Sequence, residues 1–177
     1  MNKRYLFNWT VWIASWAAVY VFIYSLSPLG QYGVVYGTFV SLPIYFTAGA
    51  KKEELMHYSA SFVAGVVWGL IFLEAITYLM NLGLGLVATQ TLVVGVLTFV
   101  CVAFHFIIAG NTIFNKIPAI FGGIAVTFST GGKSAVPIMI TLVLGAALGL
   151  LCQTGTKFLT EDGRWRFGKP EAKADKT

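Results

Sequence analysis

Residues 57–80 read HYSASFVAGVVWGLIFLEAITYLM, and Glu74 is the only acidic or basic residue in this run apart from His57. Coiled as an α-helix, the run would rise about 36 Å, which is enough to cross the roughly 30 Å of hydrocarbon in a bilayer. The rest of the chain has the same character, because 57% of its residues are hydrophobic and only 11% are charged. Since a soluble domain carries about 25% charged residues, the sequence predicts an all-α membrane protein.

Outward from this run, turn-forming and charged residues divide the chain into six apolar segments. The predicted spans are residues 6–26, 32–48, 57–80, 89–110, 117–130 and 134–153. They form one transmembrane domain, residues 1–153, followed by a basic cytoplasmic tail, residues 154–177. The second and fifth spans are short and contain proline and glycine, a pattern typical of interrupted helices near a substrate site. A tilted span in a locally thinned bilayer is the alternative explanation.

Lysine and arginine gather at alternate segment ends. They precede the first span at residues 3–4, follow the second at residues 51–52 and follow the fourth at Lys116, and six more lie after the last span. The positive-inside rule then places both termini in the cytoplasm. Lys133, after the fifth span, is the one exception.

Two similar turns indicate an internal repeat. Residues 46–51 read FTAGAK and residues 128–133 read FSTGGK, and each turn precedes an apolar segment with small residues four apart. The predicted packing positions are Ser61, Gly65 and Gly69 in one segment, and Thr141, Gly145 and Gly149 in the other. Small residues at this spacing let membrane helices approach closely. Two inverted three-helix repeats, residues 6–80 and 89–153, would make Lys133 the counterpart of Lys51; a chance match between glycine-rich sequences is the alternative.

The motif Gly65-Val66-Val67-Trp68 and several positions of the second half resemble a known family. Those positions are Pro118, Phe121, Gly123, Thr127, Phe128, Gly145 and Gly149. The chain resembles, over about residues 30–153, the YcdZ-like bacterial inner-membrane proteins, catalogued as domain of unknown function 1097. The resemblance implies a bacterial inner membrane and several spans, but no activity.

The two repeated turns are the candidate solute pathway. Its predicted residues are Phe46, Thr47, Gly49, Lys51, Phe128, Ser129, Gly131 and Lys133. Glycine permits a sharp turn, a lysine at a turn attracts anions or polar solutes, and a phenylalanine can narrow an apolar gate. The alternative is that the lysines mark aqueous turns and the phenylalanines face lipid.

Glu74 and His105 are the candidate proton carriers, since ionisable groups inside a membrane segment are costly and often functional. A snorkelling or hydrogen-bonded structural role is the alternative for Glu74, and a pH sensor is the alternative for His105. No second histidine, cysteine or acid stands at ligand spacing beside His105, so no metal site is expected. The two cysteines, Cys101 and Cys152, lie in apolar segments and are expected to be core residues.

The pattern favours a channel or facilitator for a small solute, and no hydrolase or phosphate-binding motif is present, so no enzyme activity and no cofactor are expected. A proton-coupled secondary transporter and a non-transporting scaffold are the alternatives. The expected partners are membrane lipids, a small solute and further copies of the chain. Nucleic acid is not expected, because the basic residues flank membrane segments.

Overall fold

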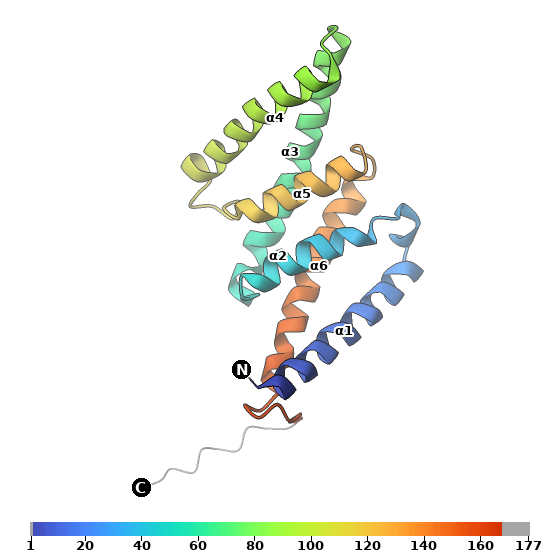
Figure 1. Cartoon of the computed structure of the whole chain (residues 1–177), viewed down its shortest axis with the longest axis vertical. Helices are drawn as coiled ribbons and strands as arrows, with labels where there is room; N and C mark the ends of the chain where they lie inside the picture. The colour runs from blue at the N-terminus through green and yellow to red at the C-terminus, as the bar shows by residue number, and fades with distance from the viewer. Residues whose placement is uncertain (1, 168–177) are drawn as a thin grey trace.

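The computed structural model describes residues 2–167, and within that range it is helical without a β-strand. The helices are α1 (Lys3–Leu26), α2 (Thr38–Thr47), α3 (Leu55–Asn81), α4 (Leu86–Ala103), α5 (Ile117–Ser129) and α6 (Ala135–Thr154) (Figure 1). A π-helical turn, Phe104–Ile108, extends α4. Short 3₁₀ turns occupy Gly30–Tyr32, Val35–Gly37, Lys52–Glu54 and Gly155–Phe158. The prediction of an all-α protein with six helices is confirmed.

Four of the helices are long and apolar enough to cross a membrane: α1, α3, α4 and α6 with their flanking turns. The other two are shorter than a span, because the 10 residues of α2 rise about 15 Å and the 13 residues of α5 about 20 Å. Residues 32–37 of the predicted second span are not α-helical, since Gly33 has φ of 65° and a 3₁₀ turn follows. Both short segments therefore form helices too short to span a membrane without tilt or thinning, and only the second predicted span is broken by 3₁₀ turns.

Each short helix packs against the long helix of the other half of the chain. α5 lies across α3 and α2 lies across α6, whereas α2 and α3 share only a small contact, as do α5 and α6 (Figure 1). α1 lies along α6 and α4 lies along α3, at opposite ends of the molecule. The two halves are therefore interlocked.

Equivalent helices of the two halves run in opposite directions, α1 against α4, α2 against α5 and α3 against α6 (Figure 1). The closest helix contacts repeat with an offset of about 80 residues. The facing pairs are Gly65 with Ile120 and Gly69 with Thr127 between α3 and α5, and Gly145 with Thr38 and Gly149 with Tyr45 between α6 and α2. This arrangement matches the two inverted three-helix repeats expected from the sequence.

Side-chain contacts assign the helix ends to two faces. Trp9 of α1 packs on Phe46 of α2 with ring centroids 5.4 Å apart, and its indole nitrogen donates to the carbonyl of Cys152 in α6. Glu54 before α3 pairs with Lys116 before α5. The start of α1, the ends of α2 and α6 and the starts of α3 and α5 therefore form one face of the molecule. The opposite helix ends, which include the turn at residues 131–133, form the other face.

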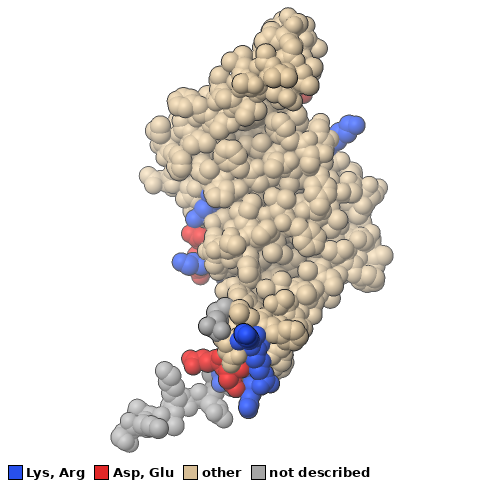
Figure 2. All heavy atoms as spheres, viewed as in Figure 1, with Lys and Arg blue, Asp and Glu red and all other residues tan. Residues whose placement is uncertain are grey.

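The charged side chains are confined to a few places on an otherwise uncharged surface (Figure 2). Among residues 2–167, every lysine and arginine except Lys133 belongs to the face that contains Trp9, Phe46, Glu54 and Lys116, which we call the positively charged face (Figure 2). Large apolar side chains such as Phe22, Phe99 and Ile107, each more than 60% exposed, project from α1 and from α4 with its π-helical turn. An apolar outer surface of this kind suits lipid rather than water.

Candidate functional site

A row of hydroxyl side chains follows one face of α2. Thr38, Ser41 and Tyr45 are three and four residues apart, so they project from the same side of the helix. All three are fully buried. Hydroxyl groups are expensive in an apolar interior unless they are hydrogen-bonded, so their partners decide what this face of α2 can do.

The partners of these hydroxyls come from α1 and from the turn after α2. The Thr38 hydroxyl donates to the Tyr20 hydroxyl at 2.8 Å, and the Tyr45 hydroxyl donates to the Lys51 carbonyl at 2.6 Å. Between them, the Ser41 hydroxyl reaches only the Thr38 carbonyl, at 3.3 Å. The α2 face therefore carries hydrogen-bonding groups along its whole length.

α6 closes the row from the opposite side. Gly145 and Gly149 face α2, which brings the α6 backbone close to Ser41 and Tyr45. One turn before Gly145, the buried Thr141 shares a 2.6 Å hydrogen bond with the Tyr24 hydroxyl of α1. We call Tyr20, Tyr24, Thr38, Ser41, Tyr45 and Thr141 the hydroxyl row.

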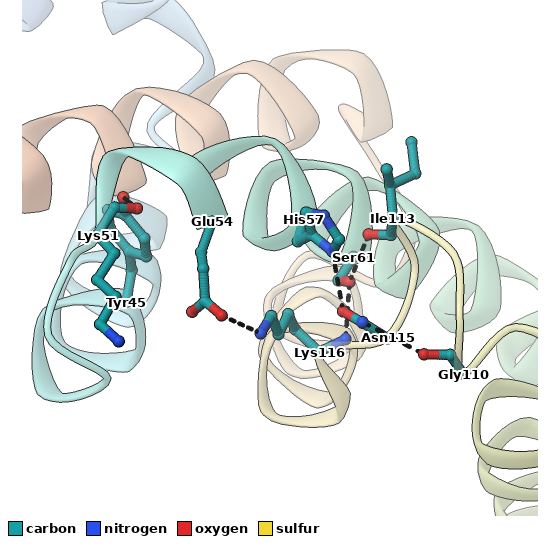
Figure 3. A network of polar contacts seen from close by, with 9 residues as sticks. All are labelled: Tyr45, Lys51, Glu54, His57, Ser61, Gly110, Ile113, Asn115 and Lys116. Atoms are coloured by element: carbon teal, nitrogen blue, oxygen red, sulfur yellow. Dashed lines mark hydrogen bonds and ion pairs between the residues drawn. The ribbon is translucent and has the colours of Figure 1, made fainter.

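The positively charged face covers one end of the hydroxyl row. The ring of Tyr58 in α3 packs on Tyr45 at 5.0 Å, and the Lys116 ammonium lies over the Tyr58 ring at 5.3 Å. Lys116 also forms a 2.9 Å ion pair with Glu54 (Figure 3). Glu54 and Lys116 thus hold Tyr58 in place over this end of the row.

The same face contains a second set of polar contacts that fastens the loop before α5 to α3 (Figure 3). The Ser61 hydroxyl donates to the Ile113 carbonyl at 3.4 Å and accepts from the Lys116 backbone N–H at 3.1 Å. His57 Nδ1 lies 3.2 Å from the Asn115 side-chain oxygen, and the Asn115 amide donates to the Gly110 carbonyl. The loop is therefore held at several points.

At the other face, the Tyr36 hydroxyl lies 2.7 Å from the Ser129 hydroxyl. This contact joins the 3₁₀ turn before α2 to the end of α5. Both short helices therefore meet at the far end of the hydroxyl row.

The eight predicted pathway residues lie at two opposite faces. Phe46 packs on Trp9, and Phe128 packs on Phe72 with centroids 6.1 Å apart. Of the others, Thr47, Gly49, Lys51, Ser129, Gly131 and Lys133 are exposed. Positive φ at Gly49 (93°) and Gly131 (61°) fits the predicted sharp turns. The structure does not gather these eight residues around one cavity.

The two predicted proton carriers lie apart from the hydroxyl row. Glu74 is exposed on α3. His105 is 2% exposed, accepts from the Trp68 indole N–H at Nε2 (3.0 Å) and lies 2.7 Å from the Phe114 carbonyl at Nδ1. Because an indole only donates and a carbonyl only accepts, these partners fit neutral His105 with its proton on Nδ1.

Four of the six predicted packing residues are glycines that face a helix of the other half, as described above. Ser61 and Thr141, which begin the two stripes, are buried and use their hydroxyls for hydrogen bonds. A methyl group on Gly65 would lie 2.8 Å from the carbonyl carbon of Ile120. The α3–α5 interface therefore leaves no room for a solute.

The sequence did not point to Thr38, Ser41 and Tyr45 as site residues, nor to the group formed by Tyr58, Glu54 and Lys116. The signal for the first three was present, because polar residues three and four apart in an apolar segment mark one helix face. No spacing rule connects Glu54 to Lys116, since only the packing of α5 on α3 brings them together. Among residues 2–167, no group of histidine, cysteine and acidic side chains could hold a metal ion.

Comparison with known proteins gives one match. A protein-family model described as "Protein of unknown function (DUF1097)" covers residues 10–157, which is most of the chain. The chain belongs to this family. The family resemblance expected from the sequence is confirmed, and the matched region contains all six helices except the first residues of α1. Neither a curated protein nor a solved structure matches the chain.

Proposed function

We propose that the protein is a membrane channel or facilitator that moves a small uncharged polar solute along the hydroxyl row. The observation that carries this proposal is the line of buried hydroxyls between α2 and α6. It lies inside a molecule that exposes many large apolar side chains. Polar side chains within membrane segments mark solute pathways, because their burial there is costly unless they serve a purpose. Close helix packing alone would be met by small residues, whereas three members of the row, Tyr20, Tyr24 and Tyr45, are large.

The chemistry of the row favours an uncharged solute. Each hydroxyl both donates and accepts a hydrogen bond, so successive hydroxyls can replace the hydration shell of an alcohol, an amide or water. The row itself contains no charged side chain, so an ion would lose its hydration without gaining a countercharge. Glu54 and Lys116 stand only at its end.

α2 is the element best suited to open the row. It is 10 residues long, contains Pro43 and follows two 3₁₀ turns, so it resembles the discontinuous helices that form substrate sites in transporters. Small displacements of α2 from α6 would expose Ser41, whose hydroxyl has only a long hydrogen bond to break. In the structure the row is buried, and movement of α2 is therefore part of the proposal.

The two alternative functions gain less support. A proton-coupled transporter needs a carrier that meets the pathway, whereas Glu74 is exposed on α3 and both nitrogens of His105 are engaged. A scaffold would need only hydroxyls that join its helices, whereas the Ser41 hydroxyl has a single long hydrogen bond within its own helix. Neither enzyme activity nor a cofactor is part of the proposal.

The test is solute flux into liposomes that contain the purified protein. Stopped-flow light scattering would follow the entry of glycerol, urea and water, and tracer uptake would follow formate and potassium. We expect faster entry of at least one uncharged solute than into protein-free liposomes, with no change for the ions. Ion flux without flux of an uncharged solute, or no flux at all, would contradict the proposal.

Two conservative variants connect flux to the hydroxyl row. Thr38→Val and Ser41→Ala each remove one hydroxyl without adding bulk, and each should slow solute entry about fivefold, as expected for loss of about 1 kcal/mol of hydrogen bonding. The matched control is Thr89→Val, because the Thr89 hydroxyl is also buried but has no hydrogen-bond partner. If all three changes slowed solute entry equally, the solute pathway would not follow the hydroxyl row.

A further inference from the structure

The chain that follows α6 folds back onto the start of α1, although the sequence predicted a tail from residue 154. The Thr160 N–H donates to the Arg164 carbonyl and the Arg166 N–H donates to the Phe158 carbonyl, which closes a tight turn. The Asn8 amide then donates to the Gly163 carbonyl at 2.8 Å. Residues 158–166 are therefore a hairpin fixed to α1; the remainder of the predicted tail, residues 168–177, lies outside the described residues.

The hairpin contributes aromatic rings to a cluster on α1. Trp12 packs on Phe158 at 5.5 Å and on Trp165 at 6.0 Å, and Trp165 stacks on Phe167 at 5.6 Å. Trp16 adds to the cluster from the next turn of α1. Tryptophan is the residue that membrane proteins place at the level of the lipid head groups.

The aromatic cluster forms the wall of a groove of about 480 Å³ on the outer surface of α1. The groove is lined by Val11, Trp12, Ser15, Trp16, Val19, Trp165 and Phe167. Val11, Ser15 and Val19 are one helical turn apart, so the groove runs along α1 from the hairpin toward the middle of the helix. Its lining is apolar apart from Ser15, which suits a hydrocarbon chain.

Basic side chains gather at the end of the molecule where the hairpin meets the start of α1 (Figure 2). Lys3, Arg4, Lys157, Arg164 and Arg166 lie in these two segments or directly beside them and are exposed, as are the acidic Glu161 and Asp162. The Thr160 hydroxyl donates to Asp162 and, with Arg164 nearby, holds the pKa of that carboxyl below its usual range. Asp162 is thus ionised at neutral pH and pairs with Arg164 at 3.0 Å, and a positive excess remains.

We propose that this groove is a binding site for an anionic phospholipid. One acyl chain lies along Val11, Ser15 and Val19 between the aromatic rings, and the phosphate lies at the hairpin end, where the exposed basic side chains of α1 and the hairpin supply the positive charge. An apolar slot with a cationic mouth at the level of a tryptophan cluster matches the two parts of such a lipid. A peptide partner is less suitable, because the slot opens toward the lipid-facing side of α1.

Thermal unfolding in a neutral detergent tests the site independently of transport. The probes are phosphatidylglycerol and phosphatidylcholine with identical acyl chains. A ligand that binds the folded state raises the midpoint of unfolding in proportion to its occupancy. We expect phosphatidylglycerol to raise the Tm by several degrees at low salt and phosphatidylcholine to raise it much less. Soluble glycerol phosphate, which lacks acyl chains, should leave the Tm unchanged.

Variants then separate the two parts of the groove. Arg166→Gln should remove most of the preference for phosphatidylglycerol, whereas Lys133→Gln, which removes the same charge at the opposite face, should not. Ser15→Phe fills the slot from the α1 side, where Ser15 is exposed. It should therefore abolish the lipid-induced rise while leaving the lipid-free Tm unchanged. Equal stabilisation by both lipids, an equal effect of Lys133→Gln, or a full response from Ser15→Phe would each overturn the proposal.

Discussion

Gly65 and Gly145 determine how closely the helices of the two halves approach. A methyl group on Gly65 would overlap the carbonyl of Ile120, and one on Gly145 would lie 2.8 Å from the Thr38 Cα. These neighbours are backbone atoms, which cannot move aside as the end of a flexible side chain can. Both glycines have ordinary α-helical backbone, which other residues can also adopt. Glycine is thus required at these positions because the neighbouring helix lies so close.

We therefore expect Gly65→Ala and Gly145→Ala each to destabilise the fold by about 1–3 kcal/mol, the usual cost of overpacking. The matched control is Gly95→Ala in α4, because a methyl group there would meet nothing within 4 Å. That change should be neutral or stabilising by about 0.5–1 kcal/mol, since alanine is the better helix former. Chemical denaturation in detergent measures all three, and destabilisation by Gly95→Ala equal to the other two would argue against close helix contacts.

At the scale of single elements, the sequence indicated most helices but not their partners. The apolar runs predicted α3 and α6 to within a few residues, and the small-residue spacing identified their glycine faces. It could not show that α3 pairs with α5 and α6 with α2, because contact partners depend on the whole packing. The start of α2 was placed too early, since the apolar residues Val35 and Tyr36 belong to a 3₁₀ turn with no hydropathy signal of its own.

The site was less predictable than the fold. The repeated turns stood out because lysine and glycine are conspicuous in an apolar chain, yet their side chains are exposed or packed on neighbouring rings. Hydroxyl residues such as Ser41 are inconspicuous, because serine and threonine are tolerated in most membrane helices. The hairpin after α6 was likewise missed, since its hydrogen bond to Asn8 joins residues 155 positions apart.

The contact between the starts of α3 and α5 leads to a prediction about gating. If Glu54 and Lys116 hold Tyr58 over the end of the hydroxyl row, Glu54→Gln and Lys116→Gln should each ease its displacement. A partly exposed ion pair contributes at most about 1 kcal/mol, so solute entry should rise up to about fivefold. The control is Lys52→Gln, a neighbouring exposed lysine. Unchanged or slower flux in both variants would show that this ion pair does not restrain the pathway.

At the scale of the whole molecule, the interlocked packing explains the distribution of charge. Because α2 and α5 are exchanged between the halves, each half supplies the closest partner of the other's long helix, and neither half can bury its glycine face alone. The inverted order then carries two similar lysine-containing turns to opposite faces, so Lys133 is separated from the other described basic residues. Lys133 on the opposite face is thus a consequence of the repeat. The larger number of basic residues on the positively charged face still predicts a single orientation in the membrane.

This orientation can be measured by single cysteines placed in a background where the buried Cys101 and Cys152 are replaced by alanine. Lys52→Cys and Asn111→Cys lie on the positively charged face, whereas Asn81→Cys and Lys133→Cys lie on the opposite one, and all four positions are exposed. With the positively charged face in the cytoplasm, a membrane-impermeant maleimide added to intact cells should label only the second pair. Lysis of the cells should make the first pair reactive. Labelling of only the first pair in intact cells would reverse the proposed orientation, and labelling of one member of each pair would contradict the inverted arrangement itself. The positive-inside rule predicts which face is outside, whereas the helix packing predicts which residues share a face. The labelling pattern therefore tests the orientation and the fold separately.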